Sequence, residues 1–516
     1  MHKKKTLLRI LQVLVLFQFL SITFINFTKS YSFLNLDSSL AMRHCVEMWK
    51  NGIFLQDYNY FSTIENDNAA FLGAPIYMIT HNLNLALGIA HILTFTFCIW
   101  ILHDIFKNLQ VSKECFLITV FLFFTPYSLG QLAWSNMFFL SVGQYEFRIL
   151  VLLLLLDLML LCDSQKYGKR KLWILTAIYS CLSLWTAISC GNYVLFMIVG
   201  PFILKAGFDI LLQQKFQMNT DKNKVLIIAA ITAFLGWQIH NHFAGPSHRN
   251  TLSLISAENF FKNFENCIAG IYLLFGGLTR EHEISIFSIH GIGIILRFLL
   301  ISFLLFLTIK ELFLAKRRKM LSSYFSSFAL VNLSVLMLTN SQYGSTVFEE
   351  RYHILWCVLL LIICAVLLFE NTLYKNIWIK NVTTYGLLLA LTFINLLGFY
   401  DMAQLPDFRE YETAILSKAI ALDADSIYLY ESPESAAVLR AQAPERYCVS
   451  IDSGLQTNTA GFYKYYSKDP ALNDRSILVC SSEEFLTLPE YIRDSYQSID
   501  NLDEQILYFS DTIVCE

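Results

Sequence analysis

Residues 352–370 read YHILWCVLLLIICAVLLFE, and no residue from Ile354 to Phe369 carries a formal charge. A helix needs about 20 mostly apolar residues to cross the roughly 30 Å hydrocarbon core of a bilayer. Similar runs recur through the first 400 positions of this chain of 516 residues, which is 55% hydrophobic and only 15% charged. This composition excludes the soluble classes and predicts an all-α polytopic membrane protein.

The apolar runs predict about eleven transmembrane helices. Their approximate bounds are 7–27, 83–106, 115–133, 149–162, 172–190, 191–207, 225–240, 289–314, 324–340, 352–370 and 381–400. The first run follows the basic opening MHKKKTLLR, and no small-x-small cleavage site comes after it. We therefore interpret it as a retained anchor rather than a cleaved signal.

The positions of the basic residues predict the orientation in the membrane, because Lys and Arg near span ends stay cytoplasmic. Basic residues gather in every second connection: Lys3 to Lys5, Lys107 with Lys113, Lys166 to Lys171, Lys215 to Lys224, Lys316 to Lys319, and Lys375 with Lys380. We therefore expect an integral protein of the cell membrane with a cytoplasmic amino terminus. An odd number of spans then places the carboxyl terminus outside.

Two parts of the chain differ in charge. Residues 401–516 hold 21 acidic and 8 basic residues, a formal charge of −13, while residues 1–400 hold 20 acidic and 30 basic residues. We expect a transmembrane domain over 1–400 and a small extracytoplasmic α/β domain over 401–516, because short apolar strands alternate with helical stretches near 433–442 and 482–497. The acidic exterior argues against a nucleic-acid partner, and the basic inner side suits anionic membrane lipid.

Three outer connections, 28–82, 127–148 and 241–288, are too long to be simple turns, and functional residues tend to lie on such loops. The first contains LDSSLAMRHCVEMWKNG at 36–52, whose apolar residues recur at roughly helical spacing. This pattern predicts a helix on the membrane surface. Asp37 or Ser38 is expected to cap its start, and Gly52 is expected to end it.

Three stretches resemble motifs of the C-type (GT-C) membrane glycosyltransferases. They are LDSSLAMRHCVEMWKNGIFLQDYNY at 36–60, ENDNAAFLGAPIYMITHNL at 65–83 and FEERYHILW at 348–356. They look like the family's acidic opening loop, its Pro-aromatic entry to the second span, and an Arg-Tyr motif that opens a late span. The resemblance points to the bacterial mannosyltransferase-like branch, which uses dolichyl- or polyprenyl-phosphate sugars. It departs from the family where Ser38, instead of a second acid, follows Asp37.

The resemblance implies sugar transfer from a polyprenyl-phosphate donor to a cell-envelope glycan or lipid. A carboxylate would take the proton of the acceptor hydroxyl, and cations would stabilise the phosphate leaving group. It implies Asp37 as the base, with Asp57 and Asp67 as second and third candidates. Donor-phosphate candidates are Arg351, His353 and Arg148.

Each of these residues also has a plain structural interpretation. Asp37 is also suited to capping the surface helix, which is the slightly favoured interpretation, and Asp57 and Asp67 to being solvated loop acids or ligands to an acceptor. Arg351 suits an interfacial anchor paired with Glu349 or Glu350.

The histidines do not form a recognisable metal site. His240, His242 and His248 lie beside Arg249, but the spacing supplies no fixed third ligand, so polar loop histidines are favoured. The sequence implies no cofactor, and a divalent metal is left open. Asp157, inside a predicted span, is expected to face a polar partner on a neighbouring helix, because a carboxylate is costly in lipid.

Two other functions fit the same sequence. A transporter or flippase of envelope precursors would carry polar residues at mid-span and broken helices. A membrane scaffold would use its outer domain to bind partners, and nothing in the sequence excludes it.

We predict that the chain ends outside the cell, because basic residues alternate between connections. A reporter that is active only in the cytoplasm, fused after Glu516, should give no signal, whereas the same reporter fused after Lys319 should be active. A strong signal from the Glu516 fusion would contradict this topology.

Overall fold

The structure is a computed structural model that divides into two compact units. Unit 1 comprises residues 1–26, 67–69 and 88–404, and unit 2 comprises residues 27–66, 70–87 and 405–516. The structure describes residues 2–514 except 56–57, 59, 61–62, 165–167, 214–219, 245–253, 281–282, 315–318, 340–349, 370–376, 444–445, 453–455, 457–470, 473–474, 502–504 and 511–512.

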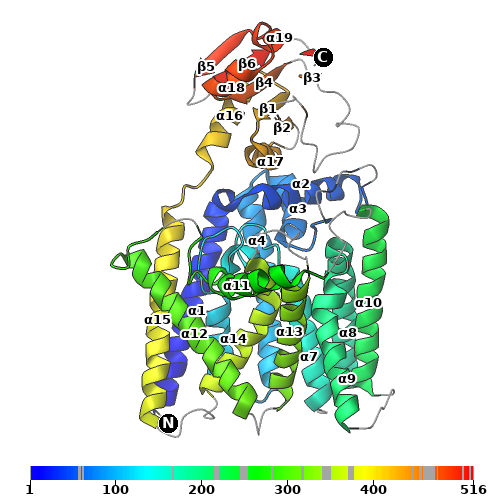
Figure 1. Cartoon of the computed structure of the whole chain (residues 1–516), viewed down its shortest axis with the longest axis vertical. Helices are drawn as coiled ribbons and strands as arrows, with labels where there is room; N and C mark the ends of the chain where they lie inside the picture. The colour runs from blue at the N-terminus through cyan, green and yellow to red at the C-terminus, as the bar shows by residue number, and fades with distance from the viewer. Residues whose placement is uncertain are drawn as a thin grey trace. The chain divides into compact units, whose positions relative to one another are not determined.

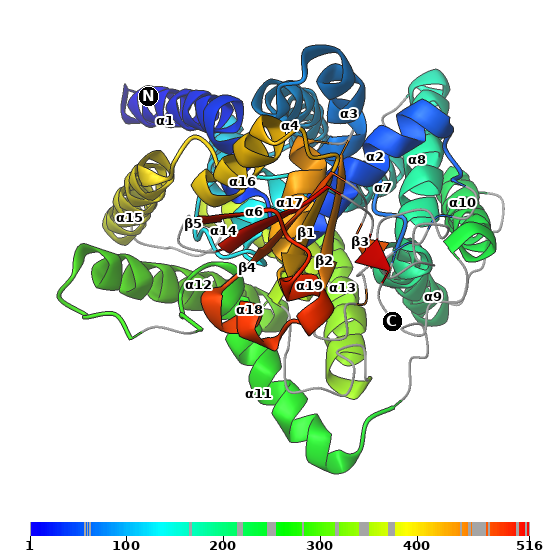
Figure 2. The same cartoon turned by 90° about the horizontal axis from the view of Figure 1, so that it is seen from above.

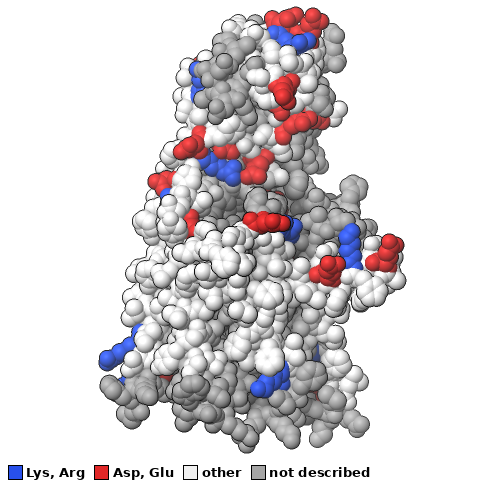
Figure 3. Space-filling view, turned by 60° about the vertical axis from the view of Figure 1, so that its left-hand side comes forward, with Lys and Arg blue, Asp and Glu red and all other residues white. Residues whose placement is uncertain are grey.

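Long apolar helices confirm the expected multi-pass membrane architecture (Figure 1). Among the described residues, nine stretches are long and apolar enough to cross a membrane. They are Lys5–Phe33, Leu83–Asn108, Lys169–Cys190, Val194–Leu211, Asp221–Ala244, Ile289–Lys310, Leu321–Leu338, Glu350–Phe369 and Val382–Gln404. Figure 3 shows a broad band over these helices with no acidic or basic side chain on the face in view.

The corresponding helices are α1 (His2–Lys29), α4 (Leu83–Asn108), α8 (Lys169–Cys190), α9 (Gly200–Gln213), α10 (Asp221–Ala244), α12 (Ile289–Leu314), α13 (Lys319–Leu338), α14 (Ile354–Phe369) and α15 (Ile377–Gln404). The short π-helix η2 (Val194–Val199) precedes α9. Every residue of α14 is buried, and this helix contacts α5 (Lys113–Phe123), α7 (Glu146–Ser164), α12 and α13. Figure 2 shows α8 and α10, which contact each other, side by side at one edge of unit 1. The most apolar stretch of the chain is therefore at the core of unit 1.

Two expected spans differ from this set. Helix α7 has 19 residues and is long enough, at about 28 Å, to cross a bilayer core, but it contains Arg148, Asp157 and Asp163. The expected span over 115–133 is wrong, because α5 ends at Phe123. Pro126 explains the end of the helix, since a proline disfavours helical backbone at the residue before it and has no N–H to donate.

The broken end of α5 is buried, and side chains satisfy its backbone. Gln18 Nε2 and Thr125 Oγ1 donate to the Phe121 carbonyl over 2.9 and 2.6 Å. The Tyr127 hydroxyl donates to the Leu122 carbonyl over 3.0 Å, and the Trp134 indole to the Phe123 carbonyl over 2.7 Å. Asn395 of α15 donates to Thr125 Oγ1 and accepts from Gln18. Irregular backbone at membrane depth is tolerated when it is covered in this way.

Helix α11 (Ala257–Leu274) runs across the long helices of unit 1 (Figure 1). One face is buried and includes Asn263, Cys267 and Ile271. The next face exposes Phe261, Phe264 and Ile268, which are 73%, 47% and 46% exposed. A helix with an exposed apolar stripe beside a polar face is typical of one that lies in the membrane interface.

Unit 2 contains the small α/β domain. Its main sheet has five strands in the order β2 (Tyr447–Ile451), β1 (Ser426–Tyr430), β4 (Ser476–Cys480), β6 (Gln505–Phe509) and β5 (Ser498–Asn501). The first three strands are parallel and the β4–β6 and β6–β5 pairs are antiparallel. The short apolar stretches 427–429, 447–451, 477–479 and 506–509, which the sequence predicts to be strands, lie in β1, β2, β4 and β6, and the predicted helix near 433–442 is α17 (Pro433–Gln442). The expected helix over 482–497 is two short helices, α18 (Ser482–Thr487) and α19 (Glu490–Arg493), separated at Pro489. A second, two-stranded sheet pairs β3 (Ala471–Leu472) with β7 (Ile513–Val514).

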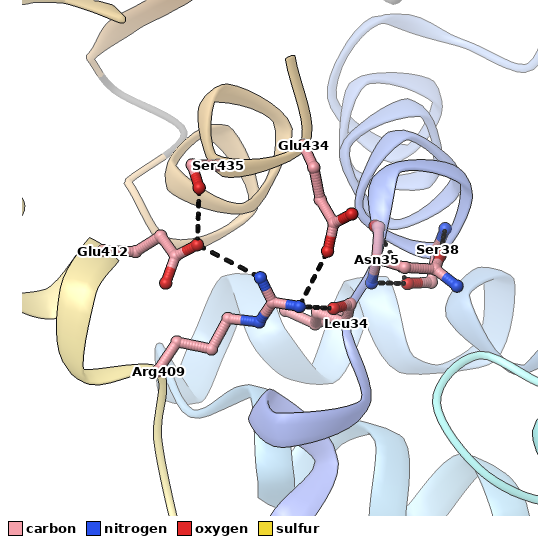
Figure 4. A network of polar contacts seen from close by, with 7 residues as sticks. All are labelled: Leu34, Asn35, Ser38, Arg409, Glu412, Glu434 and Ser435. Atoms are coloured by element: carbon pink, nitrogen blue, oxygen red, sulfur yellow. Dashed lines mark hydrogen bonds and ion pairs between the residues drawn. The ribbon is translucent and has the colours of Figure 1, made fainter. Parts of the chain in front are cut away.

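The first outer loop packs with the carboxyl-terminal segment inside unit 2. Helix α17 contacts α2 (Leu36–Asn51), and Tyr77 of α3 (Ala69–Thr80) donates to the Ala441 and Gln442 carbonyls at the end of α17. Arg409, just before α16 (Glu410–Ala421), donates to Glu412, Glu434 and the Leu34 carbonyl (Figure 4). A domain boundary at residue 400 stays a prediction.

The start of α2 corrects one expectation. Asn35 is the N-cap, and its side chain accepts from the Ser38 backbone N–H while the Ser38 hydroxyl accepts from the Asn35 N–H (Figure 4). Asp37 therefore does not cap the helix, and Ser38 takes part as the reciprocal partner. Gly52 ends the helix as expected, with φ of 101°.

Two glycines of α15 give a matched test of the packing around the broken helix. A Cβ at Gly398 would collide with the backbone oxygen of Pro126, whereas a Cβ at Gly386 meets nothing within 4 Å. We expect Gly398→Ala to lower the free energy of unfolding by about 1–3 kcal/mol through overpacking. Gly386→Ala should raise it by about 0.5–1 kcal/mol through helix propensity. Thermal unfolding of the detergent-solubilised protein measures both, and equal effects of the two variants would contradict this packing.

Candidate functional site

A buried ion pair joins two of the sequence-predicted residues in unit 1. Arg148 Nε donates to Asp67 Oδ2 over 2.7 Å, and its Nη2 lies 3.4 Å from Asp67 Oδ1. The Ser189 hydroxyl also donates to Asp67 Oδ1, over 2.6 Å. The Asp67 side chain is 1% exposed. The expectation of a solvated loop acid at Asp67 is therefore wrong.

The Arg148 guanidinium is held over two aromatic rings. Its Cζ lies 4.6 Å from the Tyr145 ring centroid and 5.1 Å from that of Tyr193. A guanidinium has five N–H donors, and Asp67 takes two of them. Within the described part of the chain, the others make no hydrogen bond. The Arg148 guanidinium is therefore held in a fixed orientation, and its remaining N–H groups can donate hydrogen bonds to an anion.

The turn over 139–146, which leads into α7 and Arg148, packs around a buried histidine of α4. His91 Nε2 lies 2.9 Å from the Ser141 carbonyl oxygen, and its Nδ1 lies 3.3 Å from Glu146 Oε1. Gly143 has φ of +58°, and a Cβ there would lie 2.9 Å from the Phe138 carbonyl oxygen, so the turn requires glycine. The Ala69 N–H donates to the Val142 carbonyl over 2.9 Å, which brings Asp67 to the same turn.

Arg351 reaches the same turn from another helix. It lies in the short helix η3 (Glu350–His353) that opens the α14 span, and its Nη1 donates to Gln144 Oε1 over 3.3 Å. Glu350 accepts from Arg280, and the expected pairing of Arg351 with Glu349 or Glu350 stays a prediction. Glu349 lies outside the described residues. Arg351 therefore contacts the chain four residues before Arg148.

His353, the third donor-phosphate candidate, is fully buried. Its Nδ1 accepts a hydrogen bond from the Trp356 indole over 2.9 Å. This contact suits a role in packing the start of α14 beneath Arg351.

The remaining carboxylate candidates lie elsewhere or outside the described residues. Asp37 is half-buried in the first turn of α2, in unit 2. Asp57 lies outside the described residues. His44, which also lies in α2, contacts the Tyr58 ring edge-on and the Tyr60 ring at a tilt. Burial lowers the pKa of His44 to about 3. His44 is therefore neutral at pH 7 and supplies no positive charge.

The other polar residues singled out in the sequence have structural partners. His240 lies in α10 rather than on a loop, and its Nδ1 is 2.8 Å from the Ile188 carbonyl oxygen. His242 also lies in α10, and His248 and Arg249 lie outside the described residues. Asp157 accepts from Asn108 over 2.7 Å, as its expected polar partner. Elsewhere, at the surface of unit 2, the neighbouring acids Asp423 and Asp425 both pair with Arg475. Among the described residues, no group of three His, Cys, Asp or Glu side chains is placed to hold a metal ion.

Sequence reasoning missed Ser189 and Tyr193, which complete the contacts around Asp67 and Arg148. The sequence did contain an indication of this junction. The apolar runs 172–190 and 191–207 are adjacent, so two helices must be joined without a loop. Gly191 ends α8 with φ of +66°, and a Cβ there would lie 3.1 Å from His240 Cδ2. A glycine at such a junction indicates a tight helix end.

Comparisons with known proteins give little further information. No family model matches the chain, and no curated protein matches it. Among solved structures, the chain is similar to an Archaeoglobus fulgidus oligosaccharyltransferase tethered with an acceptor peptide through a disulfide bond. The match has 10% sequence identity and a TM-score of 0.43, over 95% of this chain and 74% of that chain. A likeness at this level says nothing about the substrate or site of this protein.

The buried ion pair gives a stability prediction. Asp67→Leu leaves the Arg148 charge buried and unpaired, so the free energy of unfolding should fall by about 3–5 kcal/mol. The double variant Asp67→Leu with Arg148→Leu should be more stable than Asp67→Leu alone, because it removes both charges. Asp423→Asn, which loses an exposed ion pair, should cost under about 1 kcal/mol. Denaturation of the purified protein tests this order, and a double variant less stable than the single one would contradict it.

Proposed function

We propose that this chain is a membrane glycosyltransferase that transfers a sugar from a polyprenyl-phosphate donor to a cell-envelope acceptor at the outer face of the membrane. One observation carries the proposal: Arg351 donates to Gln144, four positions before Arg148, although the two arginines are 203 positions apart in sequence. Two guanidinium groups beside one turn suit a phosphate, because the planar fork of each matches two phosphate oxygens.

The proposed reaction is a single displacement at the sugar. The acceptor oxygen attacks the anomeric carbon, and a new C–O bond forms as the bond from that carbon to the phosphate oxygen breaks. The phosphate leaves with the electron pair, and Arg148 and Arg351 stabilise its negative charge. The acceptor hydroxyl gives its proton to the base.

The two acids have different proposed roles. Both oxygens of Asp67 already accept hydrogen bonds from Arg148 and Ser189, so Asp67 is suited to holding Arg148 rather than to taking a proton. Asp37, which is half-buried in the first turn of α2, is the proposed base. Its first-turn position places a carboxylate where the helix dipole favours negative charge.

A second candidate function rests on the broken helix α5. Transporters bind substrates at helices interrupted in mid-membrane, and the α5 break is surrounded by the polar side chains of Gln18, Thr125 and Asn395. Against a transport site, these side chains hydrogen-bond to one another and to the freed carbonyls. A fluorescent polyprenyl-phosphate analogue in proteoliposomes distinguishes the two functions, because a flippase moves it between leaflets with no acceptor present.

Asp37→Asn should abolish transfer while leaving the fold intact. General-base catalysis contributes about 10²- to 10⁴-fold, and an amide cannot accept the proton. The measurement is release of polyprenyl phosphate by protein reconstituted with donor and acceptor. Asn35, the actual N-cap, is unchanged, so thermal stability should match the parent.

Asp423→Asn, at an exposed acid of unit 2, is the matched control and should turn over like the parent. Full turnover by Asp37→Asn would move the search for the base to Asp57. Absence of release by the parent with every donor, together with transbilayer movement of the analogue, would replace the enzyme with a flippase.

A further inference from the structure

A pocket lies at the amino end of α12, between the start of that helix and the chain that follows α11. Its volume is about 380 Å³, which is within the range of small-molecule sites. Its lining is mostly apolar and includes Leu278, Ile284, Ile286, Ile294 and Ile295. The pocket therefore offers space for a ligand that has an apolar part.

The turn 285–288, which forms one wall of the pocket, is held against α12. The Ser288 hydroxyl donates to the Ser285 carbonyl over 2.7 Å and accepts from the Gly291 N–H over 2.9 Å. Ser288 thereby caps the start of α12. A Cβ at Gly291 would collide with the Ser285 carbonyl oxygen, so only glycine allows this close approach. The pocket wall is therefore formed before any ligand binds.

The pocket opens onto the lipid-facing side of α12. Ile295 lines the pocket and is 43% exposed, and Leu299 and Phe306 are 56% and 61% exposed. At 3.6 residues per turn, these three side chains lie on one side of the helix, whereas the buried Arg297 lies on the opposite side. An apolar chain can therefore run from the pocket along α12 without leaving the membrane.

The surroundings of the pocket are typical of the membrane interface. The amino end of α12 lies at the edge of unit 1 (Figures 1 and 2). Beside the pocket, Phe287 and Ile289 are 88% and 59% exposed. Exposed aromatic and aliphatic side chains at the end of a span favour the headgroup region of the bilayer. Under the predicted topology this is the outer leaflet.

Two charged side chains, Arg280 and Glu283, also line the pocket. Arg280 pairs with Glu350, so its charge is already compensated. Glu283 is exposed and, in the described part of the chain, has no ion-pair partner. A guanidinium has five N–H groups and can donate to a phosphate while it keeps a carboxylate partner. The charges therefore suit a ligand with a cationic group for Glu283 and a phosphate for Arg280.

We propose that this pocket binds a membrane phospholipid whose headgroup ends in a primary ammonium, as in phosphatidylethanolamine. The ammonium donates to the Glu283 carboxylate, Arg280 donates to the phosphate, and an acyl chain lies against Ile295 and Leu299. A choline headgroup has no N–H group to donate, and a glycerol headgroup has no cation. This binding site is independent of the proposed sugar transfer.

Native mass spectrometry and thermal unfolding of the detergent-solubilised full chain test this site. The probes are phosphatidylethanolamine, phosphatidylcholine and phosphatidylglycerol with the same acyl chains, and soluble phosphoethanolamine. Phosphatidylethanolamine should bind most tightly and raise the melting temperature, and phosphoethanolamine should not, because it has no chain. Glu283→Gln should weaken phosphatidylethanolamine binding about fivefold, since a partly exposed ion pair contributes up to roughly 1 kcal/mol. The same variant should not weaken binding of phosphatidylglycerol.

Two further variants separate ligand binding from a structural role. Glu265→Gln, at an exposed acid of α11, is the matched control and should bind phosphatidylethanolamine like the parent. Ile286→Ser should weaken binding of all three lipids without changing the melting temperature of the lipid-free protein, because Ile286 is 60% exposed.

Three outcomes would overturn the proposal. They are unchanged phosphatidylethanolamine binding by Glu283→Gln, equal binding of the three phospholipids, and displacement of phosphatidylethanolamine by an equimolar polyprenyl monophosphate, which would assign the pocket to the sugar donor. Asp37→Asn should bind phosphatidylethanolamine normally, so a failed transfer assay leaves this result intact.

Discussion

A backbone carbonyl that enters hydrocarbon without a donor costs several kcal/mol, and this constraint governs unit 1 at the end of α5. Pro126 prevents the helix from continuing, so the carbonyls of its last turn need other donors. Gln18 comes from α1, and its partner Asn395 comes from α15. Three helices that are remote in sequence are thereby fixed around one break, and the close approach of Gly398 to Pro126 depends on it.

The position of the candidate site follows from that break. Because α5 stops early, the chain from Phe124 to Tyr145 is a compact irregular segment that contains only the short helix α6 (Trp134–Phe138). It ends in the turn around His91, which presents Gln144 to Arg351 and Tyr145 to Arg148. An uninterrupted helix over 115–133 would have left fewer residues for this turn. The proposed phosphate site therefore depends on the polar contacts at the end of α5.

Sequence patterns within single segments predicted the helices and strands of the fold, but not the contacts between residues far apart in sequence. Long apolar runs predicted the long helices, and short apolar stretches predicted β1, β2, β4 and β6. Both patterns work because each segment is buried by its own apolar residues. The α5 break was missed because mean hydropathy does not register one proline among apolar residues. The Arg148–Asp67 pair was missed because its members are 81 positions apart, and no local pattern reports such a contact. The proximity of Asp37 to Arg351 stays a prediction.

Two buried arginines of unit 1 show how the same side chain takes different roles. Arg148 is held by the Asp67 carboxylate and the rings of Tyr145 and Tyr193, so its charge is already compensated. Its remaining N–H groups are therefore held in one orientation without a ligand. Preorganised donors of this kind stabilise charge that develops during a reaction. Arg297 lacks such a partner among the described residues: its Nε is buried without a hydrogen bond, so its charge is not compensated in the way that Asp67 compensates Arg148.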